Sequence, residues 1–220
     1  MSVRAIIRKH PKLSGMAFWI LNRLPLNNSV RMAGNRLTGG IFTKCRIRVK
    51  GKNNCIVVGR DAWISHSKLT IRGNDCQIVI GDGCVIRQGD LYIEDDGGQI
   101  RIGDGTSICG STHLASIEGK TISIGQDCLF SSAVTVRVGD SHSIMDLDGK
   151  RINPSEDVVI GDRVWVGNQT TILKGARIPA DTVVATGAVV TKKFEEPGTI
   201  LGGLPAKVIR KDIRWDRARL

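Results

Sequence analysis

The chain has 220 residues, a length that suits one medium-sized domain. Its 26 glycines and aromatic content of 4% indicate many tight corners and little room for rings inside. The net charge of +11 is uneven, because the first 60 residues carry 13 Lys and Arg and no acidic residue. The six cysteines form no CxxC pair and show no spacing typical of a metal site, so we expect reduced thiols and a cytoplasmic protein.

The N-terminal segment, residues 1–40, is expected to be basic and helical. Its apolar side chains recur at helical spacing at Leu13, Met16, Ala17, Ile20, Leu21 and Leu24. Such a helix would either cap the open end of a repeat protein or lie on an anionic membrane surface. A short second helix is expected between Asn27 and Gly39. The apolar run 17–21 is too short for a signal peptide or a membrane span.

A repeat of 22 residues begins after residue 41. Its marker is an aliphatic residue followed by Gly, found at Val58, Ile80, Ile102 and Ile124. A coil of 18 residues with four more inserted at one corner gives this spacing. The inserted corners, at 73–75, 95–98 and 118–120, are rich in turn-forming residues. We expect these corners to stack into a ridge along one edge.

The repeat shortens to six residues between Ile160 and Phe194. Aliphatic residues stand six apart at Ile160, Val166, Ile172, Ile178, Val184 and Val190. A period of six fits neither a strand nor a helix by itself. It fits a coil of three short strands, each of which turns one large and one small side chain inward. The sequence therefore predicts an all-β solenoid over residues 41–210, followed by a short tail, residues 211–220.

The repeat is interrupted once. His142 stands where the next aliphatic residue is due, and Ile160 follows Ile124 by 36 residues instead of 22. We therefore expect residues 143–157 to leave the solenoid as a loop. Loops that project from a rigid scaffold often carry function.

Four features belong together: the hexads, the loop after Asp140-Ser141-His142, the segment Val164-Trp165-Val166-Gly167 and the terminal Leu204-Pro205-Ala206-Lys207. Together they resemble the hexapeptide-repeat acyltransferases, and among them the bacterial O-acetyltransferases of sugars and capsular polysaccharides. The resemblance covers residues 50–210. It implies a left-handed parallel β-helix that forms homotrimers, binds acetyl-CoA in grooves between subunits and acetylates a hydroxyl of a surface polysaccharide or its precursor.

His142 is the candidate general base. Removing a proton from a sugar hydroxyl requires a group that titrates near neutral pH, as imidazole does. No Ser-His pair or nucleophile elbow is found, so direct attack by the acceptor is expected. Asp140 would share a strand face with His142 and orient its imidazole. The resemblance adds Trp165 as a wall of the transfer site, and the other interpretation of this residue is an exposed ring covered by a neighbouring subunit.

The resemblance also implies the residues that bind acetyl-CoA. The backbone N–H of Gly167 or Ala185 would stabilise the thioester oxyanion. Thr186 and Gly187 are small enough for pantetheine to lie flat against them. The phosphate contacts fall on Lys192, Lys193, Lys207 and Arg210. No metal is expected.

Other functions compete with this one. A γ-type carbonic anhydrase needs two closely spaced histidine ligands, whereas His66, His113 and His142 are 47 and 29 residues apart. An N-acetyltransferase of a nucleotide amino sugar is the nearest enzymatic alternative. A non-catalytic, anion-binding β-helix is the alternative from another class. Nucleic-acid binding is not expected, because the chain has one Tyr and no groove-reading motif.

A linear basic strip is the last prediction from the sequence. Arg46, Arg48, Lys50 and Lys52 alternate with other residues and therefore project from one face of a strand. A linear strip suits a linear polyanion, which favours an acidic polysaccharide as acceptor. The same strip would also hold the protein against anionic lipid at the inner face of a membrane.

Overall fold

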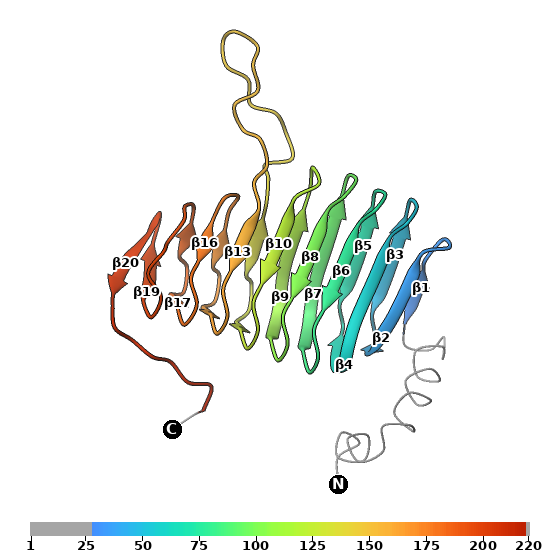
Figure 1. Cartoon of the computed structure of the whole chain (residues 1–220), viewed down its shortest axis with the longest axis horizontal. Helices are drawn as coiled ribbons and strands as arrows, with labels where there is room; N and C mark the ends of the chain where they lie inside the picture. The colour runs from blue at the N-terminus through green and yellow to red at the C-terminus, as the bar shows by residue number, and fades with distance from the viewer. Residues whose placement is uncertain (1–27, 219–220) are drawn as a thin grey trace.

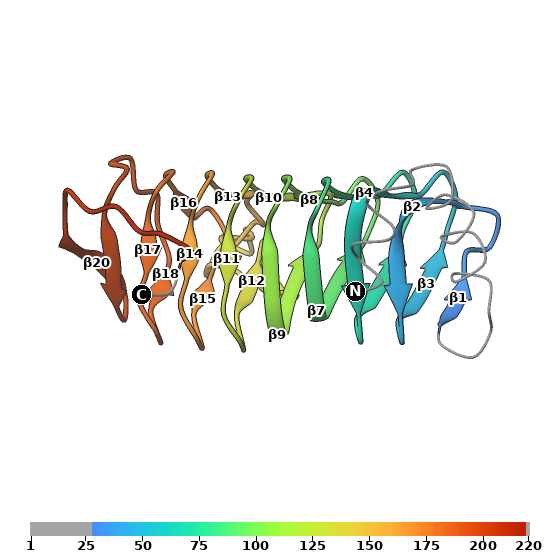
Figure 2. The same ribbon diagram turned by 90° about the horizontal axis from the view of Figure 1, so that it is seen from below.

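The computed structural model describes residues 28–218, which form a parallel β-helix with its axis along the long dimension of the molecule (Figure 1). Twenty strands stack coil upon coil into three faces (Figure 2). Paired strands run parallel, apart from the last pair, β19 and β20. Residues 28–218 contain no helix, and so none that would cross a membrane.

The strands divide among the faces as follows. The first face holds β6 (Gln77–Ile80), β8 (Gln99–Ile102), β10 (Thr121–Ile124), β13 (Val158–Ile160) and β16 (Arg177–Ile178). The second holds β11 (Leu129–Phe130), β14 (Trp165–Val166), β17 (Val183–Val184) and β19 (Ile200–Gly203). The third holds β1 (Ser29–Arg31), β3 (Arg46–Lys50), β5 (Lys68–Arg72), β12 (Thr135–Arg137), β15 (Thr171–Ile172) and β18 (Val189–Val190).

Four longer strands bend around a corner of the prism. From the first face to the second run β2 (Arg36–Thr43) and β4 (Cys55–Ser65). From the second to the third run β7 (Val85–Glu94) and β9 (Ser107–Ser116). The final strand, β20 (Ala206–Arg210), folds back against β19.

The core is the column of inward side chains that the periodicity predicts. All six aliphatic residues of the hexads are buried, from Ile160 to Val190. The small positions Val164, Thr170, Ala176, Thr182 and Ala188 are buried as well. Cys84 and Cys128 take the small position in their coils, and burial raises the pKa of each thiol to about 11. The solenoid prediction is confirmed.

The corners between the first and second faces explain the repeated glycine. A Cβ atom on Gly103 would lie 2.6 Å from the main-chain nitrogen of Gln126 in the next coil. The N–H of Gly103 also donates to the carbonyl of Ile124 at 2.8 Å. Successive coils therefore approach too closely here for any side chain.

The predicted ridge runs along the edge between the third and first faces. The inserted corners stack through side-chain amides and carboxylates, since Asn74 Oδ1 accepts from the N–H of Lys52 at 2.9 Å. Asp96 Oδ1 accepts in turn from the N–H of Asn74 at 2.7 Å. Figure 1 shows this edge as the row of turns from which the long loop projects.

The N-terminal part of the described chain is strand, not helix. The expected helix over residues 13–24 lies outside the described residues. The prediction of a short helix between Asn27 and Gly39 is wrong, because this segment forms β1, Ser29–Arg31, and the start of β2, Arg36–Thr43. The main-chain pairing of β1 with β3 accounts for this difference, although Val30 stays exposed beside the buried Ile47. Tertiary pairing thus overrides local capping signals.

We expect Gly103→Ala to lower the free energy of unfolding by about 1–3 kcal/mol, the usual range for forcing an extra methyl into a packed site. Arg101→Ala, on the strand that ends just before Gly103 and exposed, should change it by no more than about 0.5 kcal/mol. Thermal denaturation of both variants followed by circular dichroism measures the difference. Equal melting temperatures would contradict the close contact between coils.

Candidate active site

The long loop leaves the β-helix between β12 and β13, on the edge between the third and first faces (Figure 1). Its outer part is a hairpin closed by an antiparallel bridge between Met145 and Arg151. The arm carries large exposed apolar side chains, namely Ile144, Met145, Leu147 and Ile152. An arm with this much uncovered apolar surface offers a contact to another molecule.

His142 lies at the base of the loop with an exposed side chain. Its imidazole has no hydrogen-bond or ion-pair partner among residues 28–218. The predicted contact with Asp140 is not formed. The alternation rule fails because Ser141 has a φ of +68°, which ends the extended geometry between the two residues.

Asp140 holds other partners instead. Its Oδ2 atom accepts from Nζ of Lys174 at 2.5 Å and from Nδ2 of Asn153 at 2.9 Å. Hydrogen bonding from Lys174, followed by that from Asn153, lowers the pKa of the Asp140 carboxyl below its ordinary value. Asp140 therefore connects the loop to the corner of the next coil.

Asn153 is a site residue that the sequence analysis missed. Its side chain is buried, at 6% exposure, between the two ends of the loop. The Nδ2 atom donates to the carbonyl of His142 at 2.8 Å, and Oδ1 accepts from the N–H of Ile144 at 2.6 Å. In the sequence, Asn153-Pro154 indicates only a turn, so no local pattern distinguishes Asn153 as a site residue.

The ridge holds the returning arm of the loop. Arg151 Nη2 donates to Oε1 of Glu118 at 2.6 Å, and the N–H of Ser155 donates to Oε2 at 3.3 Å. The hydrogen bond from Arg151 is the main cause that lowers the pKa of Glu118. The base of the loop is thus fixed on both sides.

Trp165 lies on the second face, in β14, and is packed by the C-terminal tail. The ring centroids of Trp165 and Trp215 are 6.1 Å apart with planes at 45°. Trp215 is buried, and its Nε1–H donates to the carbonyl of Arg163 at 2.6 Å. The tail also reaches earlier coils, where Arg217 Nη2 donates to the carbonyl of Cys128 at 2.6 Å.

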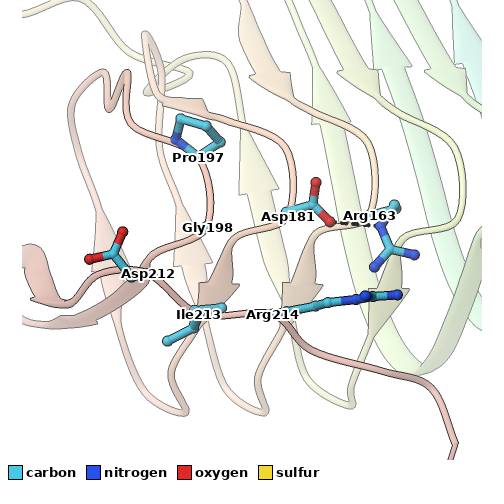
Figure 3. A pocket seen from close by; sticks show the side chains of 7 residues that line it. All are labelled: Arg163, Asp181, Pro197, Gly198, Asp212, Ile213 and Arg214. Carbon is cyan, nitrogen blue, oxygen red and sulfur yellow. Dashed lines mark hydrogen bonds and ion pairs between the residues drawn. The ribbon is translucent and has the colours of Figure 1, made fainter.

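The tail lines an open groove of about 480 Å³ (Figure 3). Figure 3 shows the ion pair between Arg163 and Asp181, 2.6 Å apart, with the Arg214 side chain lying beside it. None of the predicted acetyl-CoA residues lines this groove. Of the predicted residues, Lys193 lines a cavity of about 370 Å³ at the base of the loop.

The predicted oxyanion donors are occupied. The N–H of Gly167 donates to the carbonyl of Val184, and that of Ala185 to the carbonyl of Leu201, each at 2.8 Å. Both bonds belong to the ladder between coils. The neighbouring N–H groups of Asn168 and Thr186, on exposed corners, have no acceptor within residues 28–218. These two groups, rather than their neighbours, are free to donate to a ligand.

The other predicted acetyl-CoA residues fall on two edges. Thr186 and Gly187 are exposed at the corner between the second and third faces. Lys207 and Arg210 are exposed on β20, beside β19. Lys192 and Lys193 lie after β18, at the edge between the third and first faces, and the Lys192 ammonium is 5.3 Å from the Phe194 ring centroid.

The candidate site is therefore divided within one chain. His142 and Asp140 lie on the edge between the third and first faces. Trp165 lies on the second face, and Gly167 and Ala185 on the corner that follows it. Among residues 28–218 no group of three or more His, Cys, Asp or Glu side chains is arranged to hold a metal ion.

Known proteins share part of this sequence, although no family model matches it. The polysialic acid O-acetyltransferase of Escherichia coli O1:K1 / APEC is 35% identical over 97 residues, which cover 44% of this chain and 31% of that protein. The polysialic acid O-acetyltransferase of Neisseria meningitidis is 33% identical over 109 residues, or 49% of this chain and 51% of that protein. The chain spans about a third to a half of the length of these curated relatives.

A solved structure matches over a longer stretch. The polysialic acid O-acetyltransferase OatWY aligns with a TM-score of 0.81 at 32% identity, over 88% of this chain and 92% of that chain. With its hexads and extruded loop, the chain belongs to the hexapeptide-repeat acyltransferase family. Its fold is the left-handed parallel β-helix of that family, as the resemblance implied.

We expect the base of the loop to open in acid. Lys174 and Arg151 lower the pKa values of Asp140 and Glu118, so the contribution of these carboxylates is present above their ordinary pKa and disappears as pH falls through the lowered values. Hydrogen exchange of residues 140–156, corrected for intrinsic rate, should therefore accelerate in strong acid before exchange in the strands does. The double variant Asp140→Asn/Glu118→Gln should show the faster exchange already at neutral pH. Loop protection that does not change with pH would contradict this mechanism.

Proposed function

We propose that this protein is an O-acetyltransferase that moves an acetyl group from acetyl-CoA to a sugar hydroxyl of a bacterial surface polysaccharide or its precursor. The observation that carries the proposal is the exposed imidazole of His142, which has no partner among residues 28–218 and lies on a loop whose base is fixed by the hydrogen bonds of the buried Asn153 side chain. The similarity to polysialic acid O-acetyltransferases supports the choice of reaction and of acceptor class.

The reaction balances with His142 as the only proton carrier. The acceptor hydroxyl attacks the thioester carbonyl while His142 takes its proton, which gives a tetrahedral oxyanion. Collapse of this intermediate breaks the carbon–sulfur bond, and the imidazolium returns the proton to the leaving thiolate. A main-chain N–H would stabilise the oxyanion, and those of Thr186 and Asn168 are the available donors.

Acetyl-CoA is the proposed co-substrate, with no metal required. Its pyrophosphate and 3′-phosphate are anionic and would meet the exposed cations at Lys192, Lys193, Lys207 and Arg210. Small exposed residues at Thr186 and Gly187 leave a flat surface for the pantetheine arm. Trp165 would form a wall of the transfer site.

A homotrimer would bring the parts of the divided site together. Side chains on separate edges of one prism meet when a second subunit packs alongside the first. The exposed apolar side chains of the loop, which include Ile144 and Leu147, would be covered in such a contact. A closed ring of three subunits provides three equivalent grooves.

The basic strip favours an acidic acceptor. Arg46, Arg48 and Lys50 are all exposed on β3. In β5 the exposed Lys68 and Arg72 lie in register beside Arg46 and Lys50, so the positive charge broadens on the third face. This face leads through β7 and β9 to β12, from which the His142 loop departs. Asp90 and Glu94 follow in register on β7, so a linear polyanion bound to the strip would pass two carboxylates before it reached the proposed base.

The same strip fits a second role. Clustered cations of this kind would hold a cytoplasmic enzyme against anionic lipid, at the inner face of the membrane. Both roles rest on exposed charge and differ in the partner. An assay with an amino sugar nucleotide as acceptor tests the remaining enzymatic alternative, N-acetylation.

We expect His142→Ala to lose nearly all transfer while still binding acetyl-CoA. A general base contributes about 10²–10⁴-fold, so more than roughly a tenth of the wild-type rate would exclude this role. Acetylation of a polysaccharide acceptor, with calorimetry for acetyl-CoA binding, provides the measurement. Trp165→Ala should weaken turnover or cofactor placement, and unchanged constants would leave Trp165 a packing role only.

Mixed trimers test the shared site. Subunits carrying His142→Ala and Trp165→Ala are co-expressed with different tags, and the mixed trimers are purified through both tags. They should regain activity in about one of every three sites if each site takes the two residues from different subunits. Sedimentation velocity should give the mass of a trimer. A stable, active monomer, or mixed trimers no more active than either parent, would count against sites between subunits.

Replacing Arg46, Arg48, Lys50 and Lys52 with Gln tests the strip. Exposed charges act over about 8 Å at physiological ionic strength, so the Michaelis constant for a polyanionic acceptor should rise with salt in the wild type and lose that dependence in the variant. Lipid binding would instead appear as weaker association with phosphatidylserine vesicles. The control, Arg87→Gln/Arg101→Gln on other faces, should change neither quantity. If the four-residue variant also changes neither, the strip is a solvated surface.

A further inference from the structure

One buried amide bonds the main chain at the proposed catalytic histidine and two residues after it, and also the carboxylate of Asp140 before it. We infer that Asn153 is the positioning residue for His142, and that Asp140 and Lys174 act through it. This inference rests on the proposed function of His142 as general base. It goes further by naming what sets the position of the imidazole.

The side chain of Asn153 uses all of its hydrogen-bonding capacity in this role. Nδ2 donates to Oδ2 of Asp140 at 2.9 Å and to the carbonyl of His142 at 2.8 Å. Oδ1 accepts from the N–H of Ile144 at 2.6 Å and from Nε of Arg151 at 3.3 Å. Two donors face two acceptors, so the orientation of the amide is fixed by its surroundings.

These bonds hold a short piece of main chain. The carbonyl of residue 142 and the N–H of residue 144 both meet the same amide, so the backbone from His142 to Ile144 is clamped at both ends. The imidazole itself is exposed and has no partner within the described residues. Among the described residues only the backbone restrains the imidazole, and Asn153 holds that backbone through the carbonyl of His142 and the N–H of Ile144.

The chain of contacts ends on the rigid β-helix. Lys174 lies in the corner after β15, one coil beyond the loop, and its Nζ atom is 2.5 Å from Oδ2 of Asp140. The coil thus fixes the carboxylate of Asp140 through Lys174. That carboxylate fixes the amide of Asn153, and the amide holds the main chain at His142. Because a displacement of about 1 Å at a reacting group can cost about 10²-fold in rate, loss of this clamp should be visible in turnover.

Only an amide fits this position. Aspartate would keep the acceptor for Ile144 but lose both donors, and its carboxylate would face that of Asp140. Alanine would remove every bond. Neither change touches the residues assigned to acetyl-CoA, so the dissociation constant for acetyl-CoA should stay the same.

The experiment compares Asn153→Ala and Asn153→Asp with Asn54→Ala. Asn54 is a matched control, because it is also buried and bonds only main-chain groups, with Nδ2 on the carbonyls of Lys50 and Gly73. We expect both Asn153 variants to lose about 10²-fold in kcat with unchanged affinity for acetyl-CoA. Asn54→Ala should be less stable yet keep its kcat at temperatures where it is folded.

A double-mutant cycle separates positioning from general stability. If Asn153 acts through His142, Asn153→Ala should have little further effect in a His142→Ala background. Equal losses in both backgrounds, or a kcat for Asn153→Ala within twofold of the wild type, would overturn the inference.

Lys174→Met, at the outer end of the network, should lower kcat less, and Lys174→Arg should restore it. If the Asn153 variants do not fold, the two Lys174 variants test the inference instead. Equal kcat values for Lys174→Met and wild type would then overturn it.

Hydrogen exchange at the Ile144 amide provides a readout that needs no activity. This amide should exchange faster in Asn153→Ala and keep its protection in Asn54→Ala. If His142→Ala retains transfer, the proposed base fails, whatever the exchange shows. If Ile144 exchange is unchanged in Asn153→Ala, the clamp fails even though His142 remains the base.

Discussion

The main-chain ladder between successive coils is the constraint on which the rest of the structure depends. Gly103 donates to Ile124, Gly125 to Ile160 and Gly161 to Ile178, each at 2.8 Å. Because these bonds are evenly spaced, every coil must place its inward residues directly above the equivalent residues of the coil before. The aliphatic column, the glycine corners and the stacked ridge all follow from that one requirement.

The ladder also explains how a long loop is tolerated. β10 pairs with β13 in full register, so that Ile124 lies beside Ile160 although 36 residues separate them. The extra residues therefore leave and re-enter at neighbouring points of one edge. A functional segment held in this way can differ in length or sequence without disturbing the coils above and below it.

The sequence predicts the repeated part of the molecule far better than the site. Periodicity identifies inward residues such as Val166 and Ile172 because each coil repeats the same environment. The Asn153 clamp has no such repetition: it joins a side chain to main-chain atoms across a loop, and spacing alone cannot reveal that contact. The sequence also cannot show that the N–H of Gly167 is already hydrogen-bonded, because almost every residue carries a main-chain N–H whatever its side chain.

Asp140 shows how a local rule fails at a functional corner. The period-two rule placed its side chain with that of His142, but a left-handed residue between them turns the chain. The carboxylate is then satisfied by Lys174 and Asn153, both distant in sequence. Trp215 is similar, because only the folded tail brings it to Trp165.

The stack of coils also acts as a ruler. Four strand pairings separate β3, with its basic strip, from β12, which leads into the His142 loop. At ~4.8 Å per pairing, the two lie roughly 19 Å apart along the axis. Duplication or loss of one 22-residue unit would lengthen or shorten this span by a single step of ~4.8 Å while leaving both ends intact. A repeat protein of this kind can therefore change its reach along a polymer in fixed increments, without redesigning either end.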